Sequence, residues 1–203
     1  LLLNQFSMIA FASAIEPLRA ANRQSNQALF DWVVASPDGN TSTASNGMSV
    51  QTDAELEALQ SCRMVFVCAG VRVRENTNKS ILNLIRRLDR NGAVIGAICT
   101  GTYVMAAAGL LDGRRCTIHW ENIDGLAEEF PHLDITNDLF EIDGNRVTVL
   151  KRSCGMRRGT ISPTISMLKP RSRILHHVFW RRWPRALPTQ PEAGLPQALS
   201  TAS

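Results

Sequence analysis

The residue best placed for chemistry is Cys99, because it separates an apolar run from a segment of small residues. Residues 93–98 are typical of a buried strand, and residues 100–108, closed by Gly109, are typical of a helix. A thiol at such a turn lies at the carboxyl end of a strand, where open α/β sheets bind their ligands. The helix N-terminus favours the thiolate, so Cys99 is the candidate nucleophile. A buried core cysteine is the alternative interpretation.

A second candidate segment brings together an imidazole, an indole and a carboxylate in His119, Trp120 and Glu121. These groups precede an expected helix over residues 121–130, and they suit a pocket for a cationic amine through cation–π and charge contacts. The alternative is structural: Trp120 belongs to the core, and Glu121 is a first-turn residue favoured by the helix dipole. Cys116 and His119 have the spacing of half a metal site, but no second pair completes it, so no metal is predicted.

Length and composition are those of one domain with an appendage, since the chain has 203 residues of which 44% are apolar. The longest apolar run, residues 104–111, is far shorter than the ~18 residues of a membrane span, and residues 1–3 lack the basic flank of a secretory signal. Five cysteines without a Cys-x-x-Cys pair do not indicate a disulfide framework. We expect a soluble, cytoplasmic protein with no membrane partner, in which residues 1–3 end a strand of a longer chain.

Charge divides the chain close to Leu150. Residues 1–150 hold 12 Lys and Arg against 17 Asp and Glu, whereas residues 151–203 hold 10 against 1 and contain most of the prolines. The sequence therefore predicts a domain over residues 1–150 and a basic tail, rich in Pro and Arg, over residues 151–203.

The domain begins with an expected helix that Ser7 caps and Pro17 interrupts, which predicts a kinked or two-piece helix. Its apolar positions recur at helical spacing: Met8, Phe11, Ile15 and Leu18.

Strand and helix signals alternate after this helix. Expected strands lie at residues 32–35, 64–68 and 93–98, and expected helices at residues 77–90, 100–108 and 121–130. We expect Asp53 to cap a short helix between the first two strands, and Asp143 and Gly144 to form the turn of a hairpin between residues 139–142 and 146–150. This order predicts an α/β fold, a doubly wound and mostly parallel sheet between helices, with a late antiparallel hairpin.

Six motifs, in this order, resemble a known family. They are residues 7–22, residues 36–39 (Ser-Pro-Asp-Gly), residues 66–71 (Phe-Val-Cys-Ala-Gly-Val), residues 99–101 (Cys-Thr-Gly), residues 108–113 (Ala-Gly-Leu-Leu-Asp-Gly) and residues 116–122 (Cys-Thr-Ile-His-Trp-Glu-Asn). The sequence up to Val147 resembles the N-terminal domain of GlxA-like regulators of the AraC family, within the PfpI/ThiJ, class I glutamine amidotransferase-like superfamily. The resemblance implies a flavodoxin-like sandwich and a homodimer without a cofactor. It also implies sensing of a small nitrogenous metabolite and control of an attached DNA-binding domain.

The resemblance also bears on catalysis. In catalytic relatives an acidic residue on the first helix assists the cysteine at the strand-to-helix turn, which we call the elbow. In protease-like members a histidine follows this cysteine. The alignment places Ala10 and Thr100 at these two positions, and Glu16 lies one and a half turns away from the first. Sensing is therefore favoured over turnover, with Cys99 as a vestigial nucleophile. The alternative is a PfpI/ThiJ-type cysteine hydrolase or hydratase that uses Cys99.

The predicted ligand site follows from these motifs. Backbone N–H groups near Gly70 and Thr100 are placed to cradle an anion or oxyanion. The expected ligand-binding residues are Gly70, Val71, Cys99, Thr100, His119, Trp120 and Glu16.

The resemblance stops after Val149, where the family continues with a covering helix and two helix-turn-helix units. Three interpretations of residues 151–203 compete: a basic extension that binds nucleic acid without sequence preference, a partner-binding segment, or an out-of-frame translation of the ancestral gene. The simultaneous loss of all family features favours the third. We therefore expect DNA binding only through a helix-turn-helix domain that this chain lacks, and we rank a nonspecific nucleic-acid binder below the sensor and the enzyme.

Overall fold

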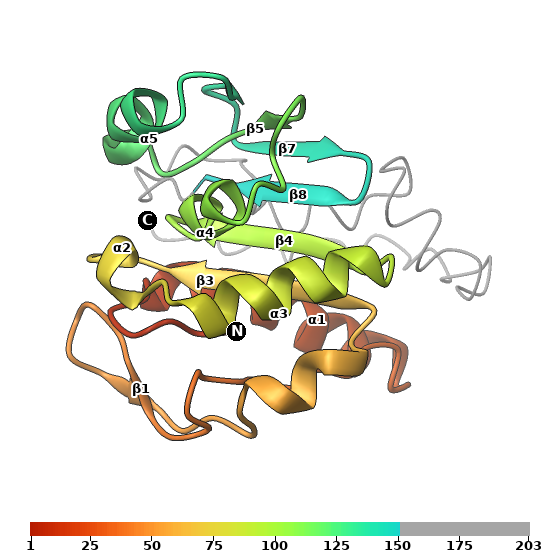
Figure 1. Ribbon diagram of the computed structural model, residues 1–203. Coiled ribbons are helices and arrows are strands. Elements are labelled where there is room, and N and C mark those ends of the chain that lie inside the picture. The colour runs from red at the N-terminus through yellow and green to blue at the C-terminus, as the bar shows by residue number, and fades with distance from the viewer. Residues whose placement is uncertain (151–203) are drawn as a thin grey trace, which may run out of the picture.

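The computed structural model describes residues 1–150, which form an α/β sandwich around a four-stranded sheet (Figure 1). The strand order is β3 (Met64–Ala69), β4 (Val94–Cys99), β8 (Arg146–Val149) and β7 (Phe140–Asp143). The first three strands are parallel, and β7 pairs antiparallel with β8. The predicted fold class, with its late hairpin, is confirmed.

The remaining elements connect and cover these strands. The helices are α1 (Met8–Ser25), α2 (Val73–Asn76), α3 (Lys79–Arg90), α4 (Thr102–Ala107) and α5 (Ile123–Glu129), with 3₁₀ turns η1 (Leu56–Ser61) and η2 (Trp120–Asn122). Two short pairs complete the description: β1 (Ser42–Thr43) with β2 (Ser49–Val50), and β5 (Arg115–Cys116) with β6 (Asp134–Ile135). No helix within residues 1–150 is long and apolar enough to cross a membrane.

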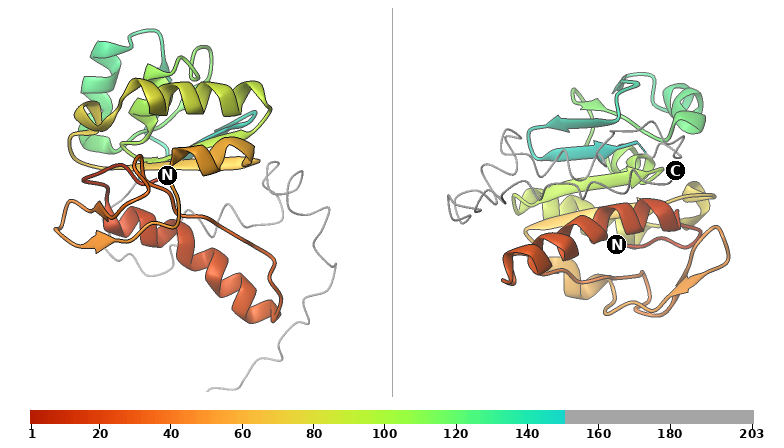
Figure 2. Two further views of the ribbon diagram at one scale, coloured as in Figure 1. Left: turned by 60° about the horizontal axis from the view of Figure 1, so that its bottom comes forward. Right: turned by 180° about the vertical axis from the view of Figure 1, so that it is seen from behind.

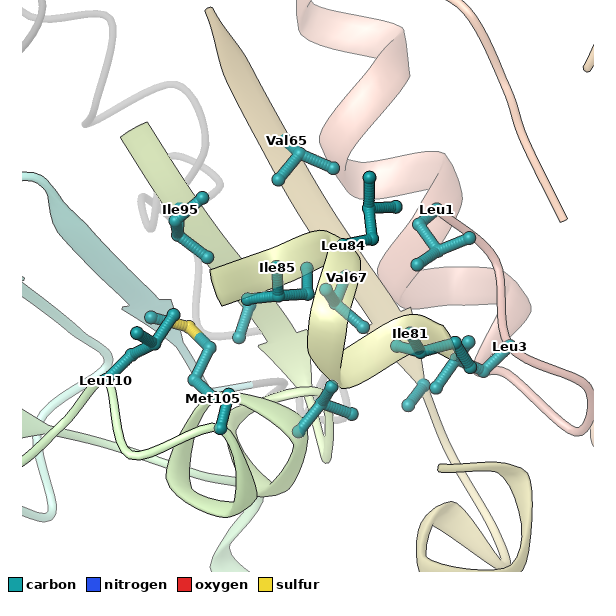
Figure 3. Packing of buried hydrophobic residues seen from close by; sticks show 14 of the residues in the cluster. Leu1, Leu3, Val65, Val67, Ile81, Leu84, Ile85, Ile95, Met105 and Leu110 are labelled. Carbon is teal, nitrogen blue, oxygen red and sulfur yellow. The ribbon is translucent and has the colours of Figure 1, made fainter. Parts of the chain in front are cut away.

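Helix α3 covers one face of the sheet through the stripe that its sequence predicts. Its four stripe residues are at most 2% exposed: Ile81, Leu84, Ile85 and Leu88. They pack on Val65 and Val67 of β3 and on Ile95 of β4 (Figure 3). Each such side chain contributes about 1.5–3 kcal/mol on burial. The helix begins at Asn78, whose side-chain Oδ1 accepts a hydrogen bond from the Ile81 N–H at 3.0 Å.

Helix α1 covers the opposite face, so that β3 and β4 lie between α1 and α3 (Figure 2). The residues of this second apolar cluster come from α1, from the chain before it, from the turn between β1 and β2, and from β3 and β4: Leu2, Phe6, Ala10, Ala44, Cys68, Ile98 and Cys99. Leu2 forms an isolated parallel bridge with Cys68, which places residues 1–3 beside β3 without a strand of their own. Cys99 thus reaches the face that α1 covers.

Proline 17 does not divide α1, which is one helix from Met8 to Ser25. A proline inside a helix removes one backbone hydrogen bond, here the one to the Ser13 carbonyl. The Pro17 ring is buried, and burial of apolar surface acts against this loss. The two-piece alternative is therefore wrong.

Residues 32–35 do not form the expected strand. Trp32 is 37% exposed and Val33 is 50% exposed, and Ala35 makes a single bridge to Ala54. Asp53, predicted as a helix cap, instead accepts a hydrogen bond from the Val34 N–H with its carboxylate at 2.9 Å, and its own N–H donates to the Val34 carbonyl. Both predictions are wrong for one reason. The Asp53 side chain binds the backbone of residues 32–35 and so stabilises an irregular segment, whereas residue propensity predicted a strand there and a helix cap at Asp53.

The hairpin between β7 and β8 is confirmed, with its turn one residue later than predicted. Asp143 pairs with Arg146, so the loop consists of Gly144 and Asn145. Gly144 has a φ of 61°, a conformation that glycine adopts without strain.

Candidate functional site

Cys99 ends β4 in a strained conformation. Its φ is 62°, which costs a residue with a side chain roughly 1–2 kcal/mol, and the residue is 4% exposed. Gly101 follows because a Cβ at this position would lie 2.2 Å from the Val67 carbonyl oxygen. The sharp strand-to-helix turn predicted from the sequence is therefore present, and its thiol faces the interior.

The segment after β3 lies against this elbow. The Thr100 hydroxyl donates a hydrogen bond to the Gly70 carbonyl at 2.6 Å, which joins two predicted site residues. Gly70 admits no side chain, because a Cβ would lie 2.3 Å from the Gln5 carbonyl oxygen. Val71 is 58% exposed, and its N–H donates to the same Gln5 oxygen at 3.0 Å. The Val71 N–H is thus engaged within the protein, which removes one donor from the predicted anion cradle.

His119 reaches the elbow from the segment between β5 and η2. Its N–H donates to the Cys99 carbonyl at 3.4 Å, and its side chain is 13% exposed. The Nδ1 atom lies 3.7 Å from the Glu121 carboxylate, an ion pair when the imidazole is protonated. The Trp120 ring stands 5.8 Å from the His119 ring and is 58% exposed, so the interpretation of Trp120 as a core residue is wrong. An exposed indole beside a carboxylate can bind a cation through a cation–π contact with the ring face and through the negative charge of the carboxylate.

Helix α1 presents a methyl group to the elbow. Ala10 is 3% exposed and belongs to the apolar cluster that contains Cys99, so the position expected to carry a carboxylate in catalytic relatives is an apolar wall here. Glu16 faces solvent further along α1, where its carboxylate binds Arg19 at 2.6 Å. The hydrogen bond from Arg19 lowers the pKa of Glu16. The structure therefore gathers Gly70, Thr100 and His119 around Cys99, while Glu16 lies on the outer surface.

Ser7 lies next to the candidate site, although the sequence predicted only a helix cap there. It occupies the N-cap position of α1 and is 5% exposed, but its hydroxyl has no hydrogen-bond partner within residues 1–150, so the predicted side-chain cap is absent. A buried hydroxyl left unsatisfied costs about 1–3 kcal/mol. Its N–H donates to the Ala69 carbonyl at 3.4 Å, which places Ser7 beside Gly70. The signal available in the sequence was a serine directly before the first helix.

Cys116 is unsuited to nucleophilic or metal chemistry. The residue is fully buried, and burial, followed by the charges of Asp134 and Glu141, raises its pKa to about 11. Within residues 1–150, no group of three or more His, Cys, Asp or Glu side chains is arranged to hold a metal ion.

A hollow of about 420 Å³ lies away from the elbow. Its lining is residues 60–63 and residues 91–94, at the amino ends of β3 and β4. Cys99 lies at the carboxyl end of the same strand, β4. The hollow therefore lies at the opposite end of the strands and is not part of the candidate site.

Comparison with known proteins agrees with this fold. The family model of the DJ-1/PfpI family matches residues 1–153. The HTH-type transcriptional regulator CdhR of Pseudomonas aeruginosa is 50% identical over 148 residues, 73% of this chain and 44% of that protein. The HTH-type transcriptional regulator GlxA of Rhizobium meliloti is 45% identical over 150 residues, 73% of this chain and 46% of that protein. The resemblance to GlxA-like regulators is confirmed, and the chain spans less than half the length of either relative.

A solved structure extends the comparison to the fold. The AraC family transcriptional regulator from Pseudomonas putida superposes with a TM-score of 0.64 at 28% identity, over 73% of this chain and 80% of that chain.

Proposed function

Because this chain belongs to the DJ-1/PfpI family, we propose that residues 1–150 are the ligand-sensing domain of an HTH-type transcriptional regulator. The observation that carries the proposal is the pairing of Cys99 with Ala10. The elbow retains its strained backbone, but the helix that covers it supplies a methyl group and no acid. General acid–base help contributes about 10²–10⁴-fold to such reactions, so binding is the better use of this geometry.

We further propose that the sensed molecule is a small nitrogenous metabolite. Trp120 is exposed beside His119 and Glu121, and an indole face with a nearby carboxylate is a favourable environment for an amine. Gly70, Val71, Thr100 and the thiol of Cys99 form the rest of the proposed binding surface, with Glu16 as a peripheral charge.

The output of the sensor lies in the longer regulator. We propose that a homodimer in the cytoplasm couples the ligand to DNA. The names of the similar regulators support a helix-turn-helix domain as the part that binds DNA. The proposed boundary of the sensor is Leu150.

A thermal-shift screen with amines and amino acids tests the sensor proposal. A ligand present at 100 Kd stabilises the folded state by about 2.7 kcal/mol, which a melting curve detects. We expect Trp120→Ala and Cys99→Ala to abolish the shift, and Trp32→Ala, which truncates another exposed tryptophan, to retain it. Equal shifts in all four proteins would place the ligand elsewhere.

An enzyme is the second candidate, favoured by the strain at Cys99 and by the approach of His119 to the elbow. It predicts product formation from a substrate with an electrophilic carbon, abolished by Cys99→Ser. Stabilisation by a ligand that is recovered unchanged would contradict it.

A further inference from the structure

Three segments that form the candidate site each continue into a short helix at the same end of the sheet (Figure 1). The segment with Gly70 leads into α2, the elbow leads into α4, and the segment with His119 leads through η2 into α5. In sequence these helices are far apart. One network of side chains nevertheless connects all three.

The centre of the network is the Glu129 carboxylate at the end of α5. One oxygen accepts a hydrogen bond from the Tyr103 hydroxyl of α4 at 2.7 Å, and the other binds Nη2 of Arg74 of α2 at 2.7 Å. The Arg74 guanidinium also lies 5.6 Å from the centre of the Tyr103 ring, within cation–π range. The Tyr103 ring packs edge-to-face on Phe130. Each helix is therefore joined to the other two.

Stability alone is a weak explanation for this arrangement. The side chains of Arg74 and Glu129 are 61% and 37% exposed, and exposed ion pairs contribute little to the stability of the whole fold. Each of the three helices is already anchored in the core, through Val73 of α2, Met105 of α4 and Leu126 of α5. The network therefore acts locally: it joins the outer ends of helices whose inner faces are packed separately.

We infer that Arg74, Tyr103 and Glu129 form a clamp that holds the three site segments closed over Cys99. These are positioning residues: they act through the segments that lead to Gly70, Thr100 and His119, and they need not touch a ligand. The inference rests on the proposed site, but not on the identity of its ligand. Breaking the clamp lowers the free energy of local opening at the site and leaves the rest of the sheet intact.

The rate of Cys99 alkylation by iodoacetamide measures this opening directly, since a residue that is 4% exposed reacts from an opened state. Peptide mapping by mass spectrometry separates Cys99 from Cys116, which is fully buried in β5, a strand that pairs with β6 and lies outside the three helices. In the full chain, we expect Glu129→Ala to raise the Cys99 rate by roughly three- to tenfold while the Cys116 rate stays unchanged.

Two further variants sharpen the test. Glu128→Ala removes the same charge from the preceding exposed position of α5 and should leave both rates unchanged. Tyr103→Phe keeps the ring packing on Phe130 and should raise the Cys99 rate in the wild-type background. It should add nothing to Glu129→Ala, because the acceptor of the hydroxyl is then already absent.

An unchanged Cys99 rate in Glu129→Ala, or a parallel rise at Cys99 and Cys116, would overturn the clamp. A response in Glu128→Ala equal to that in Glu129→Ala would also overturn it. Because no ligand takes part, the clamp can succeed where the thermal-shift screen finds no ligand, and it can fail where the screen succeeds.

Discussion

At the scale of single residues, the backbone of Cys99 is held in place by its neighbours. The Gly101 N–H donates to the Ile98 carbonyl at 3.1 Å, and the His119 N–H donates to the carbonyl of Cys99 itself. The Thr100 hydroxyl fixes the next residue to Gly70. A strained conformation persists only where its surroundings determine it in this way, and such strain collects at functional sites. The elbow is therefore the part of the structure that points most directly to a function.

Cys116 gives the domain a pH-dependent stability. Its pKa is about 11 in the folded state, against 9.0 for an ordinary thiol, so the unfolded chain loses this proton first as the pH rises. The contribution to stability is complete below pH 9 and declines through the folded pKa near 11, because the folded state then retains a proton that the unfolded state has released.

We expect this decline to reach on the order of 1–3 kcal/mol between pH 9 and pH 11. Urea unfolding of the wild-type protein and Cys116→Ala at pH 8 and pH 10 measures it. The difference in unfolding free energy between the two proteins should shrink at the higher pH. A difference that is constant between the two pH values would contradict the raised pKa.

At the scale of elements, the sequence was sufficient where one periodic signal dominated. The stripe of α3 and the apolar runs of β3 and β4 were predicted correctly, and the hairpin of β7 and β8 was predicted with its turn one residue too early. The predictions for residues 32–35 and for Pro17 were wrong because tertiary structure outweighed local propensity. A hydrogen bond to Asp53 holds residues 32–35 outside a strand, and the Pro17 ring is buried within an unbroken helix. The strand-to-helix turn at Cys99 was predictable, but the unsatisfied hydroxyl of Ser7 and the proposed clamp at Glu129 depend on which loops meet in space.

Arg146 shows how β8 is fixed to its neighbours. The side chain is 8% exposed, its Nη2 lies 2.7 Å from Oδ1 of Asp89 in α3, and its Nε donates to the Leu110 carbonyl at 2.9 Å. Nη1 has no partner within residues 1–150. The Asp89 side chain is 25% exposed. The buried Arg146 guanidinium therefore needs the Asp89 carboxylate as a counter-charge, whereas water can still solvate the Asp89 carboxylate if Arg146 is removed.

This asymmetry predicts unequal effects of the two substitutions. Asp89→Ala leaves a buried guanidinium without its counter-charge and should cost about 3 kcal/mol or more. Arg146→Met keeps an unbranched side chain in place, removes the unsatisfied Nη1 and leaves a carboxylate that water reaches, so it should cost about 1–2 kcal/mol. Chemical unfolding of both variants measures the difference. An equal loss, or a larger loss in Arg146→Met, would mean that the ion pair does not govern this junction.

At the scale of the whole molecule, the division of charge is the feature that no contact within the sandwich explains. Residues 1–150 are acidic and residues 151–203 strongly basic, and the predictions about the basic segment lie outside the described residues. Residues 1–150 carry a net negative charge and are not attracted as a whole to a phosphate backbone, so we expect any affinity of this chain for DNA to come from the basic segment.

Such binding would be nonspecific and sensitive to salt, and the full chain offers a matched test. Replacing Arg181 and Arg182 with Gln should weaken binding to random-sequence DNA and reduce the slope of log K against log salt by up to about 2, because each lost phosphate contact releases about 0.9 fewer counterions. Replacing Arg87 and Arg90 with Gln changes the net charge equally on the exposed side of α3 and should leave the slope unchanged. A gel-shift titration in 50–300 mM salt measures both. Binding that resists salt and selects one sequence would instead mean that the basic segment reads DNA bases, and that the chain carries its own output.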